Sequence, residues 1–411
     1  MILEYLIIGA GVTGITLCKK LKEKGIDNVL VLEKAPEAGG LCRSKIINGH
    51  MLDIGGGHFF NTKHEDVMDY VFQHLPRHHF NYYQRVSKIE LGPDCTIDYP
   101  IESNIWQMPL DRQIEYIISV VRNGEASGKA EPKNYEEWIR WKLGDRICDD
   151  YMIPYNQKLW GVDPERMDID WLHKIPRVAV EEILKYCLEK KQDKNKFPAH
   201  IFFYYPKEGG FQSIIDALLK DEKENIRLNE KVERLEYDGK IWHINGRYEA
   251  RNVINTAPWN DLYDALGRPE ELKELISKII YNRIVISLYE AEYRHDWHWR
   301  YIPDIKNPYH REFFIHNFAE DSKSDGIYLE TNIKRFHEDY LYQDKTALTH
   351  FETDAAYPIP VTGHADAIKK ILDHYRPMRL FGVGRWGQHE YQNADVSMHE
   401  AIQFVESVTG E

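Results

Sequence analysis

The amino-acid sequence lacks any long apolar run. None of its uninterrupted hydrophobic stretches approaches the roughly 18–20 residues that are needed to cross a bilayer. The opening stretch MILEYLIIGAG resembles a signal peptide only superficially, because Glu4 stands where basic residues would be expected and the stretch runs directly into a glycine motif. We therefore interpret it as a buried first strand, and we expect no membrane span.

Cysteine is scarce and follows no recognisable pattern. The five cysteines are odd in number and scattered, without the spacing of metal ligands: Cys18, Cys42, Cys95, Cys148 and Cys187. This usage favours a reduced, cytoplasmic protein in which we expect no metal site.

Positive charge is also in short supply. The 53 Lys and Arg residues face 66 Asp and Glu residues, which gives a formal net charge of −13. Nucleic acid and anionic membranes would both be repelled, so we expect neither as a partner, although a local basic pocket for an anionic small molecule is still allowed. With 43% hydrophobic and 29% charged residues, the chain is otherwise an ordinary globular protein, long enough at 411 residues for two or three domains.

The pattern of apolar residues predicts an α/β protein with three parts. YLIIGAGVTGITLCKKLKEKG reads as strand, tight turn and helix, because a continuous apolar run suits a parallel strand that is covered on both faces. Residues 105–195 carry apolar residues at helical spacing and lead into a polar linker at 190–197, whereas later segments alternate strands with tight turns. We predict a discontinuous Rossmann-like nucleotide-binding domain made of residues 1–75, 205–260 and 376–411. A helical substrate domain is predicted at 105–200. An antiparallel sheet domain is predicted at 76–104 and 261–375.

A glycine motif lies between the first strand and the first helix. Gly9 allows the turn, Gly11 lets the backbone approach a pyrophosphate, and Gly14 permits close packing of the helix. The free N–H groups at the start of this helix, where Val12 and Thr13 lie, favour an anion. Glu33 follows Gly14 at the end of the next strand, where a carboxylate can bind a ribose diol. These features in this order predict a dinucleotide site.

The segments that flank this motif resemble flavin-dependent amine-oxidase-like proteins rather than NAD dehydrogenases. KAPEAGGLCRS contains Lys34, Gly40 and Leu41, and in DIGGGHFF the glycines Gly56 and Gly57 would let the backbone lie against an isoalloxazine ring. We therefore predict FAD as the cofactor and a Rossmann-like FAD-binding domain. Further contacts are expected from the C-terminal segment, where Arg385 would meet the pyrophosphate, and Ala394 and Asp395 or Ser397 the ribityl chain. The backbone of Val232 would meet the adenine.

Motifs between residues 154 and 395 make the resemblance more specific. PYNQKLWGVDP, WLHKIPR, YIPDIKNPYHR, YPIP and GRWGQHEYQNAD occur in this order, and together they resemble the UDP-galactopyranose mutase family over nearly the whole chain. Such enzymes are isomerases of polysaccharide biosynthesis that convert the pyranose form of a nucleotide-diphosphate sugar to the furanose form on reduced FAD. The resemblance implies that flavin N5 attacks the anomeric carbon and displaces the diphosphate. NAD(P)H or another donor would then act as the reductant.

The resemblance also implies roles for particular side chains. Arg177 and Arg311 match a pair of arginines that hold the departing diphosphate, a task for which bidentate guanidiniums are suited. The spacing around Arg177 looks bacterial rather than eukaryotic. Tyr301, Tyr357 and Tyr391 match tyrosines whose hydroxyls donate to the same diphosphate. His58 matches a histidine beside the flavin, with no metal role.

The segment PYNQKLWGVDP contains two residues that resemble contacts to the nucleotide half of the substrate. The indole of Trp160 would line the base or ribose, and the amide of Asn156 would bond nearby. Stacking a base on an aromatic ring is worth on the order of 1–3 kcal/mol. The alternative is a core tryptophan at a turn of helix.

One departure from the family bears on the substrate. Its eukaryotic members have a tyrosine–proline–phenylalanine–glutamine run at the base, where this sequence has Tyr99, Pro100, Ile101 and Glu102. An amide can donate to a uracil carbonyl, whereas a carboxylate can only accept. We therefore hypothesise a nucleotide other than uridine, such as guanosine. The sugar is left open: galactose, another hexose or a heptose would each suit the family.

Two other functions are compatible with the same motifs. An FAD-dependent oxidoreductase of the amine-oxidase or protoporphyrinogen-oxidase type would share the cofactor domain but would need an apolar or aromatic cage at the flavin. A flavin-binding protein without catalysis is disfavoured by the intact glycine loops and both arginines. The sequence leaves the oligomeric state open, and a homo-oligomer is allowed.

Overall fold

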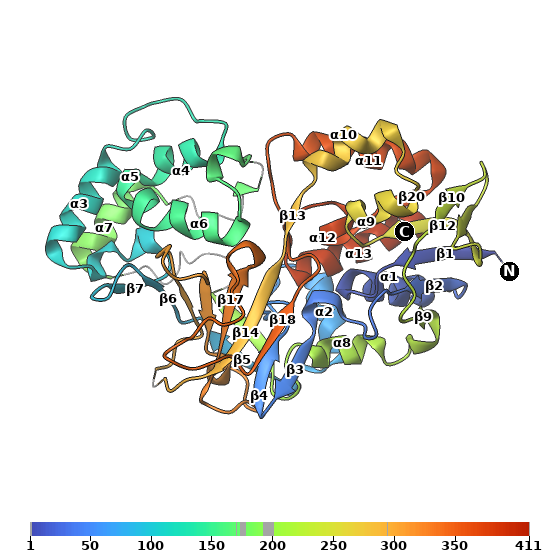
Figure 1. Cartoon of the computed structure of the whole chain (residues 1–411), viewed down its shortest axis with the longest axis horizontal. Helices are drawn as coiled ribbons and strands as arrows, with labels where there is room; N and C mark the ends of the chain where they lie inside the picture. The colour runs from blue at the N-terminus through green and yellow to red at the C-terminus, as the bar shows by residue number, and fades with distance from the viewer. Residues whose placement is uncertain (1, 170, 173–177, 192–200, 294, 411) are drawn as a thin grey trace.

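The structure is a computed structural model that describes residues 2–169, 171–172, 178–191, 201–293 and 295–410. Arg177 and residues 192–197 of the predicted linker lie outside the described residues. Figure 1 shows a helical part at one end of the molecule, a sheet layered with helices at the other, and a second sheet between and below them.

The first sheet has a parallel core whose strands come from three distant parts of the sequence. Strand β1 (Leu3–Ile8) lies between β2 and β12, and alternate residues of β1 face opposite sides. Tyr5 and Ile7 pack into the hydrophobic cluster on one face, whereas Leu6 and Ile8 pack into the cluster on the other. The remaining strands are β2 (Val29–Leu32), β9 (Ile226–Arg227), β12 (Tyr248–Asn255) and β20 (Leu380–Gly382), with β10 (Leu235–Tyr237) and β11 (Trp242–Ile244) antiparallel at one edge.

Helices cover both faces of this sheet. Helix α1 (Val12–Glu23) is preceded by its N-cap residue Gly11 and packs against α13 (Ala394–Thr409), so helices from the two ends of the chain lie side by side, as the blue and red ribbons of Figure 1 show. On the same face lie α2 (Glu65–His74) and α8 (Gln212–Leu219). The opposite face is covered by α9 (Trp259–Ala265), α10 (Glu270–Lys278) and α11 (His364–Tyr375).

The second sheet is antiparallel except where β15 pairs with β6. Its central strand β17 (Gly326–Asn332) is buried along its whole length because hydrophobic clusters cover both faces, with Tyr328 on one side and Ile327 and Leu329 on the other. The strand order is β18 (Thr349–Glu352), β14 (Ile284–Glu290), β17, β16 (Arg311–Phe313), β15 (Trp299–Tyr301), β6 (Ser87–Glu90) and β7 (Thr96–Asp98). Three strand pairs join the parts, namely β3 (Ser44–Ile47) with β4 (His50–Asp53), β5 (Phe80–Gln84) with β8 (Phe202–Pro206), and β13 (Tyr281–Asn282) with β19 (Tyr357–Pro358).

The helical part has a core of its own. Tyr116, Trp138 and Ile183 are buried there by helices that each carry an apolar face. The helices are α3 (Leu110–Val121), α4 (Tyr135–Leu143), α5 (Asp145–Ile147), α6 (Ile153–Trp160) and α7 (Val180–Glu189); the short α12 (Gly384–Gly387) lies beside the first sheet. In the described part of the chain, no helix is both long and apolar enough to span a membrane. The predicted α/β fold class is confirmed, whereas the exact domain boundaries stay predictions.

The glycine turn yields a prediction about stability. A Cβ atom on Gly14 would lie 2.0 Å from the carbonyl oxygen of Gly9, whereas a Cβ atom on Gly11 would meet nothing within 4 Å. We expect Gly14→Ala to lower the free energy of unfolding by on the order of 1–3 kcal/mol, because α1 must move away from β1. Gly11→Ala is the matched control and should leave this value nearly unchanged. Urea unfolding of the flavin-free protein measures both; equal losses would contradict this account of the packing.

Candidate functional site

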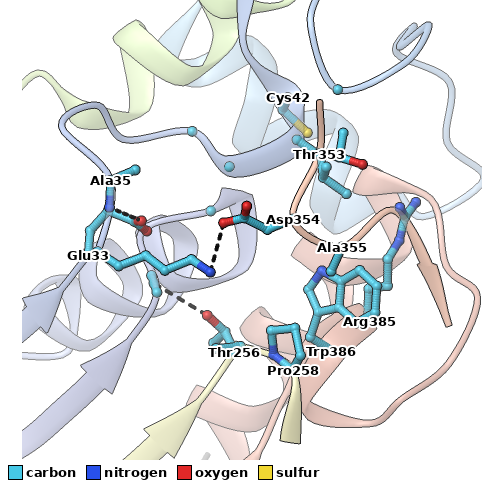
Figure 2. A pocket seen from close by; sticks show the side chains of 18 of the residues that line it. Glu33, Ala35, Cys42, Thr256, Pro258, Thr353, Asp354, Ala355, Arg385 and Trp386 are labelled. Atoms are coloured by element: carbon cyan, nitrogen blue, oxygen red, sulfur yellow. Dashed lines mark hydrogen bonds and ion pairs between the residues drawn. The ribbon is translucent and has the colours of Figure 1, made fainter. Parts of the chain in front are cut away.

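A cavity of about 690 Å³ opens where β1, β2 and β12 end at their carboxyl sides. This is the edge of a parallel sheet at which nucleotide cofactors bind. Most of the predicted cofactor residues line it: Gly9, Gly11, Val12, Thr13, Glu33, Lys34, Gly40, Leu41, His58, Val232, Arg385, Ala394 and Ser397. Figure 2 shows some of these side chains around the cavity.

Four of the predicted cofactor residues are not among those that line the cavity in the described structure: Gly14, Gly56, Gly57 and Asp395. Gly14 acts in packing, as shown above. At Gly57 a Cβ atom would lie 2.1 Å from the ring of Phe313, so this glycine lets the loop pass the second sheet. Asp395 is buried in the first turn of α13, and its role at the ribityl chain stays a prediction.

Glu33 organises the nucleotide end of the cavity. The backbone N–H of Ala10 donates to Oε2 at 2.7 Å and that of Ala35 donates to Oε1 at 2.8 Å, so the carboxylate braces the glycine turn. Each carboxylate oxygen can accept a further hydrogen bond, which leaves room for a ribose diol. The Nζ of Lys34 lies 2.8 Å from Oδ2 of Asp354, which ties this turn to the segment after β18.

The cavity also has walls that the sequence analysis missed. The hydroxyl of Thr256 donates to the carbonyl of Ile8 at 2.8 Å and so ties the end of β12 to that of β1. The position of Thr256 directly after a predicted strand was a signal that could have identified it. Residues 351–355 and Tyr281 come from the β14 side of the molecule, and no local pattern marks them as cavity residues.

His58 lies where the cavity meets the second sheet. Burial and the nearby Arg385 lower the pKa of His58 to about 4, so its ring is neutral at physiological pH. The ring atom Nδ1 lies 2.6 Å from the carbonyl oxygen of Gly56, which orients the imidazole. Asp53 accepts a hydrogen bond from the His58 N–H at 3.2 Å and another from the Ser44 hydroxyl at 2.6 Å. The Asp53 carboxyl therefore holds the loop that contains Gly56 and His58 against Ser44.

Arg385 places a positive charge at the same end. Its Nη1 donates to the carbonyl of Ala356 at 2.9 Å and its Nε to that of Gln392 at 2.8 Å. The guanidinium lies over the rings of Tyr357 and Tyr391, 5.7 Å and 5.9 Å from their centroids. Among the described residues no carboxylate forms an ion pair with Arg385, so its charge is available to an anionic ligand.

Arg311 is held by a buried carboxylate that the sequence analysis missed. Its Nη2 donates to Oε2 of Glu330 at 2.7 Å, while the Tyr357 hydroxyl donates to Oε1 at 2.9 Å and His310 lies 3.2 Å from the same oxygen. Burial alone would raise the pKa of Glu330, but Arg311 and His310 hold this pKa well below its usual range. The Nε of Arg311 is buried and has no hydrogen-bond partner within the described residues. One donor of this guanidinium is therefore left unused by the described structure.

Aromatic side chains connect these charges to the helical part. The ring of Tyr99 lies 5.1 Å from that of Tyr301, which in turn lies 5.4 Å from that of Tyr155. Tyr391 lies 5.5 Å from both Tyr357 and Trp160. The structure therefore brings together the predicted substrate residues Tyr99, Trp160, Tyr301, Arg311, Tyr357 and Tyr391, and it adds Tyr155 and Glu330.

Trp160 and Asn156 bind each other. The indole N–H donates to Asn156 Oδ1 at 2.9 Å, and Asn156 Nδ2 donates to the carbonyl of Met152 at 2.7 Å. Trp160 is only 1% exposed. This is the packing expected of a core tryptophan at a turn of helix, the alternative stated above. A contact of either residue with a nucleotide stays a prediction.

Glu102 is buried beside the tyrosines. Its side chain is 5% exposed, and burial raises its pKa to about 7, opposed only by its own backbone N–H. No cation faces it within the described part of the chain. Arg177, the second predicted diphosphate arginine, lies outside the described residues, so its place relative to Arg311 is not defined.

Known proteins resemble this chain over most of its length. The family model of flavin containing amine oxidoreductases matches residues 12–300. "Probable UDP-galactopyranose mutase" of Klebsiella pneumoniae is 24% identical over 228 residues, which are 55% of this chain and 55% of that protein, so the matched region spans about half of this relative. A solved structure of reduced UDP-galactopyranose mutase has a TM-score of 0.87 at 23% identity and covers 99% of this chain and 96% of its own.

A second solved structure shows how widely the fold is used. The CLA-producing fatty acid isomerase from P. acnes has a TM-score of 0.68 at 15% identity, with 98% of each chain covered. The fold predicted from the resemblance is confirmed. Identities this low establish the fold alone, so the substrate must be argued from the site.

The buried pair of Arg311 and Glu330 yields a second prediction. Glu330→Gln keeps the shape but leaves the guanidinium facing an amide N–H₂, so we expect a loss of on the order of 3 kcal/mol in the free energy of unfolding. The double variant Arg311→Met with Glu330→Gln should be less destabilised than the sum of the single variants. A double-mutant cycle by urea unfolding measures this coupling. The exposed pair Arg234 and Glu236, whose nitrogen–oxygen distance is also 2.7 Å, is the matched control and should show almost none. Additive losses at the buried pair would contradict the assignment.

Proposed function

The chain belongs to the family of flavin-containing amine oxidoreductases, and from that premise we propose that it is a mutase that interconverts the pyranose and furanose forms of a nucleotide-diphosphate sugar. Family membership makes it a flavoenzyme of the mutase and oxidoreductase superfamily. The mutase activity, the nucleotide-sugar substrate and the isomerase class are the parts that we propose.

One observation carries the proposal: the side chains beside the flavin end of the cavity form a surface for an anion. Arg311 and Arg385 both approach Tyr357, one donating to its hydroxyl at 3.3 Å and the other lying over its ring. An amine substrate is a cation and would be repelled by two guanidiniums. A diphosphate would instead be attracted, and its developing charge on departure would be stabilised. This disfavours the alternative of an amine-oxidising enzyme on the same scaffold.

The residues around Arg311 suit the task of holding a diphosphate. The unpartnered Nε of Arg311 and the hydroxyls of Tyr301 and Tyr391 are the donors that we assign to it. The Tyr357 hydroxyl would join them by exchanging its bond to Glu330 for one to the diphosphate. Glu330 fixes the guanidinium and thereby reduces the reorganisation needed when charge develops. By resemblance, Arg177 would supply the second guanidinium.

The cofactor that we propose is FAD, and the cavity residues fit it. The N–H groups at the start of α1 suit the pyrophosphate, Glu33 suits the adenosine ribose and Val232 lies where the adenine would meet backbone. Arg385, Ser397 and Asp395 are assigned to the flavin half. When bound and reduced, the flavin would supply the nucleophile for the anomeric carbon. His58 is neutral and tied to Gly56, so we assign it to positioning at the flavin rather than to proton abstraction.

The proposal is tested by a reaction that depends on flavin reduction but consumes no electrons overall. The protein is reduced with dithionite without air, candidate UDP- and GDP-sugars are added, and furanose products are separated by chromatography. Conversion only after reduction supports the mutase. Stoichiometric hydrogen peroxide formed from an amine in air would instead support the oxidoreductase.

Substitution of Arg311 gives the third prediction. Arg311→Lys keeps a cation beside Glu330 but removes the planar fork and its Nε donor, so kcat for the mutase reaction should fall more than tenfold. The flavin absorbance and the thermal midpoint should stay close to those of the unchanged protein, because the charge pair is kept. Arg251→Lys at an exposed position is the matched control. Unchanged turnover in Arg311→Lys would remove this arginine from the mechanism.

The fourth prediction concerns the base, for which we propose a donor-rich ring such as guanine. A carboxylate at Glu102 can accept from guanine N1–H and N2–H, and such a bidentate pair discriminates between bases by about 1–3 kcal/mol. At pH 8, above the raised pKa of Glu102, GDP should bind at least tenfold more tightly than UDP, and Glu102→Gln should narrow the difference.

Calorimetry with the oxidised flavoprotein measures these affinities, with the exposed Glu115→Gln as the control. Tighter binding of UDP would refute the guanine assignment but leave the mutase standing. Failure of both nucleotides to bind would instead count against the nucleotide-sugar substrate itself.

A further inference from the structure

Outside the cavity, two histidines and an aspartate from opposite ends of the chain come together. His64 immediately precedes α2, Asp66 lies in the first turn of that helix, and His399 lies in the second turn of α13. One ligand atom of each residue lies within 4.8 Å of the others, and His399 Nδ1 is 2.7 Å from Asp66 Oδ2. All three side chains are partly exposed, so solvent can reach them.

An ion pair between His399 and Asp66 does not account for the whole cluster. The ring of His64 stacks on that of His399 with centroids 3.9 Å apart and planes inclined by 19°. Within the described residues the ring of His64 has no hydrogen-bond partner. Two adjacent imidazoles with a carboxylate beside them form the ligand type that zinc and related ions prefer. An ion held by both would lie in the plane of each ring, so the two rings would turn out of this stack on binding.

Two carboxylates lie close to the paired imidazoles. Asp395 lies four residues before His399, on the same face of α13, and its carboxylate acts on His64 together with that of Asp66. Burial, His399 and Lys63 together lower the pKa of His64, and the two carboxylates oppose this shift.

We propose that His64, Asp66 and His399 bind a divalent transition-metal ion of the zinc type, with water completing the coordination. The ion would clamp α2 to α13. Helix α13 carries Ala394 and Ser397 into the cofactor cavity, and α2 follows the loop that carries His58. The bound ion would therefore stabilise the packing of the two helices that support the cofactor cavity, whichever substrate the enzyme uses.

Sequence spacing does not reveal this site, and we expected no metal from the sequence. Asp66 and His399 are 333 residues apart, whereas spacing rules detect ligands that are close in the chain. Only the packing of α2 against α13 on one face of the sheet brings them together.

The test uses tag-free flavoprotein that has been treated with a chelator. Titration with Co²⁺, followed by its visible absorption, and competition with Zn²⁺ should show one equivalent bound. His399→Ala and, as a second variant, His64→Gln should weaken binding by at least tenfold. The exposed His374→Ala on α11 is the control and should bind as the unchanged protein does. Zn²⁺ should also raise the thermal midpoint of the unchanged protein but not that of His399→Ala.

Three results would overturn the proposal. The first is the absence of stoichiometric binding by the unchanged protein. The second is that His399→Ala and His64→Gln both bind the ion as tightly as the unchanged protein does. The third is binding that survives both changes but is lost in Glu290→Gln, because it would place the ion at the other cluster of suitable ligands in the described structure, His50, Glu290 and Asp325.

Discussion

The candidate site depends on one buried carboxylate. Glu330 is fully buried in the central strand of the second sheet, and its two oxygens engage Arg311, Tyr357 and His310. Without a partner the guanidinium of Arg311 would be costly to bury, and without Arg311 the carboxylate would be equally costly. Because β16 pairs with β17, with Arg311 opposite Glu330 in the register, the pair is set by the sheet itself. A fixed guanidinium with a free Nε is therefore a consequence of the fold.

The two sheets contribute different groups to the candidate site. The parallel sheet presents the ends of its strands and the start of α1, which suit a dinucleotide, while the antiparallel sheet presents charge and hydroxyl groups to the flavin end. Arg385 joins them, since it comes from the C-terminal segment after β20 and lies over the rings of Tyr357 and Tyr391. An acidic protein can thus keep a locally positive site, because these cations bind backbone carbonyls and a single buried carboxylate.

The same arrangement explains why family likeness and function must be separated here. The fold is shared with proteins of different activities, and identities of 15–24% leave the substrate open. What argues for a nucleotide-sugar mutase is the chemistry of Arg311, Tyr357 and Arg385. The aromatic segment of α6 is less informative than its composition suggests, because the Trp160 indole donates to Asn156 and the Asn156 amide donates to the Met152 carbonyl inside the protein.

The cofactor turn and the fold class could be predicted from the sequence, because both depend on residues that are close together in the chain. A glycine turn between strand and helix, with Glu33 at the end of the next strand, involves residues that are near neighbours in the chain, and their chemistry is set by backbone geometry. The α/β fold class followed from apolar periodicity in the same way. Glu330, the pairing of Trp160 with Asn156, and the cluster of His64 with His399 were decided only by the tertiary structure. Their roles depend on which distant side chains share a buried or crowded space, and hydrophobic periodicity does not carry that information.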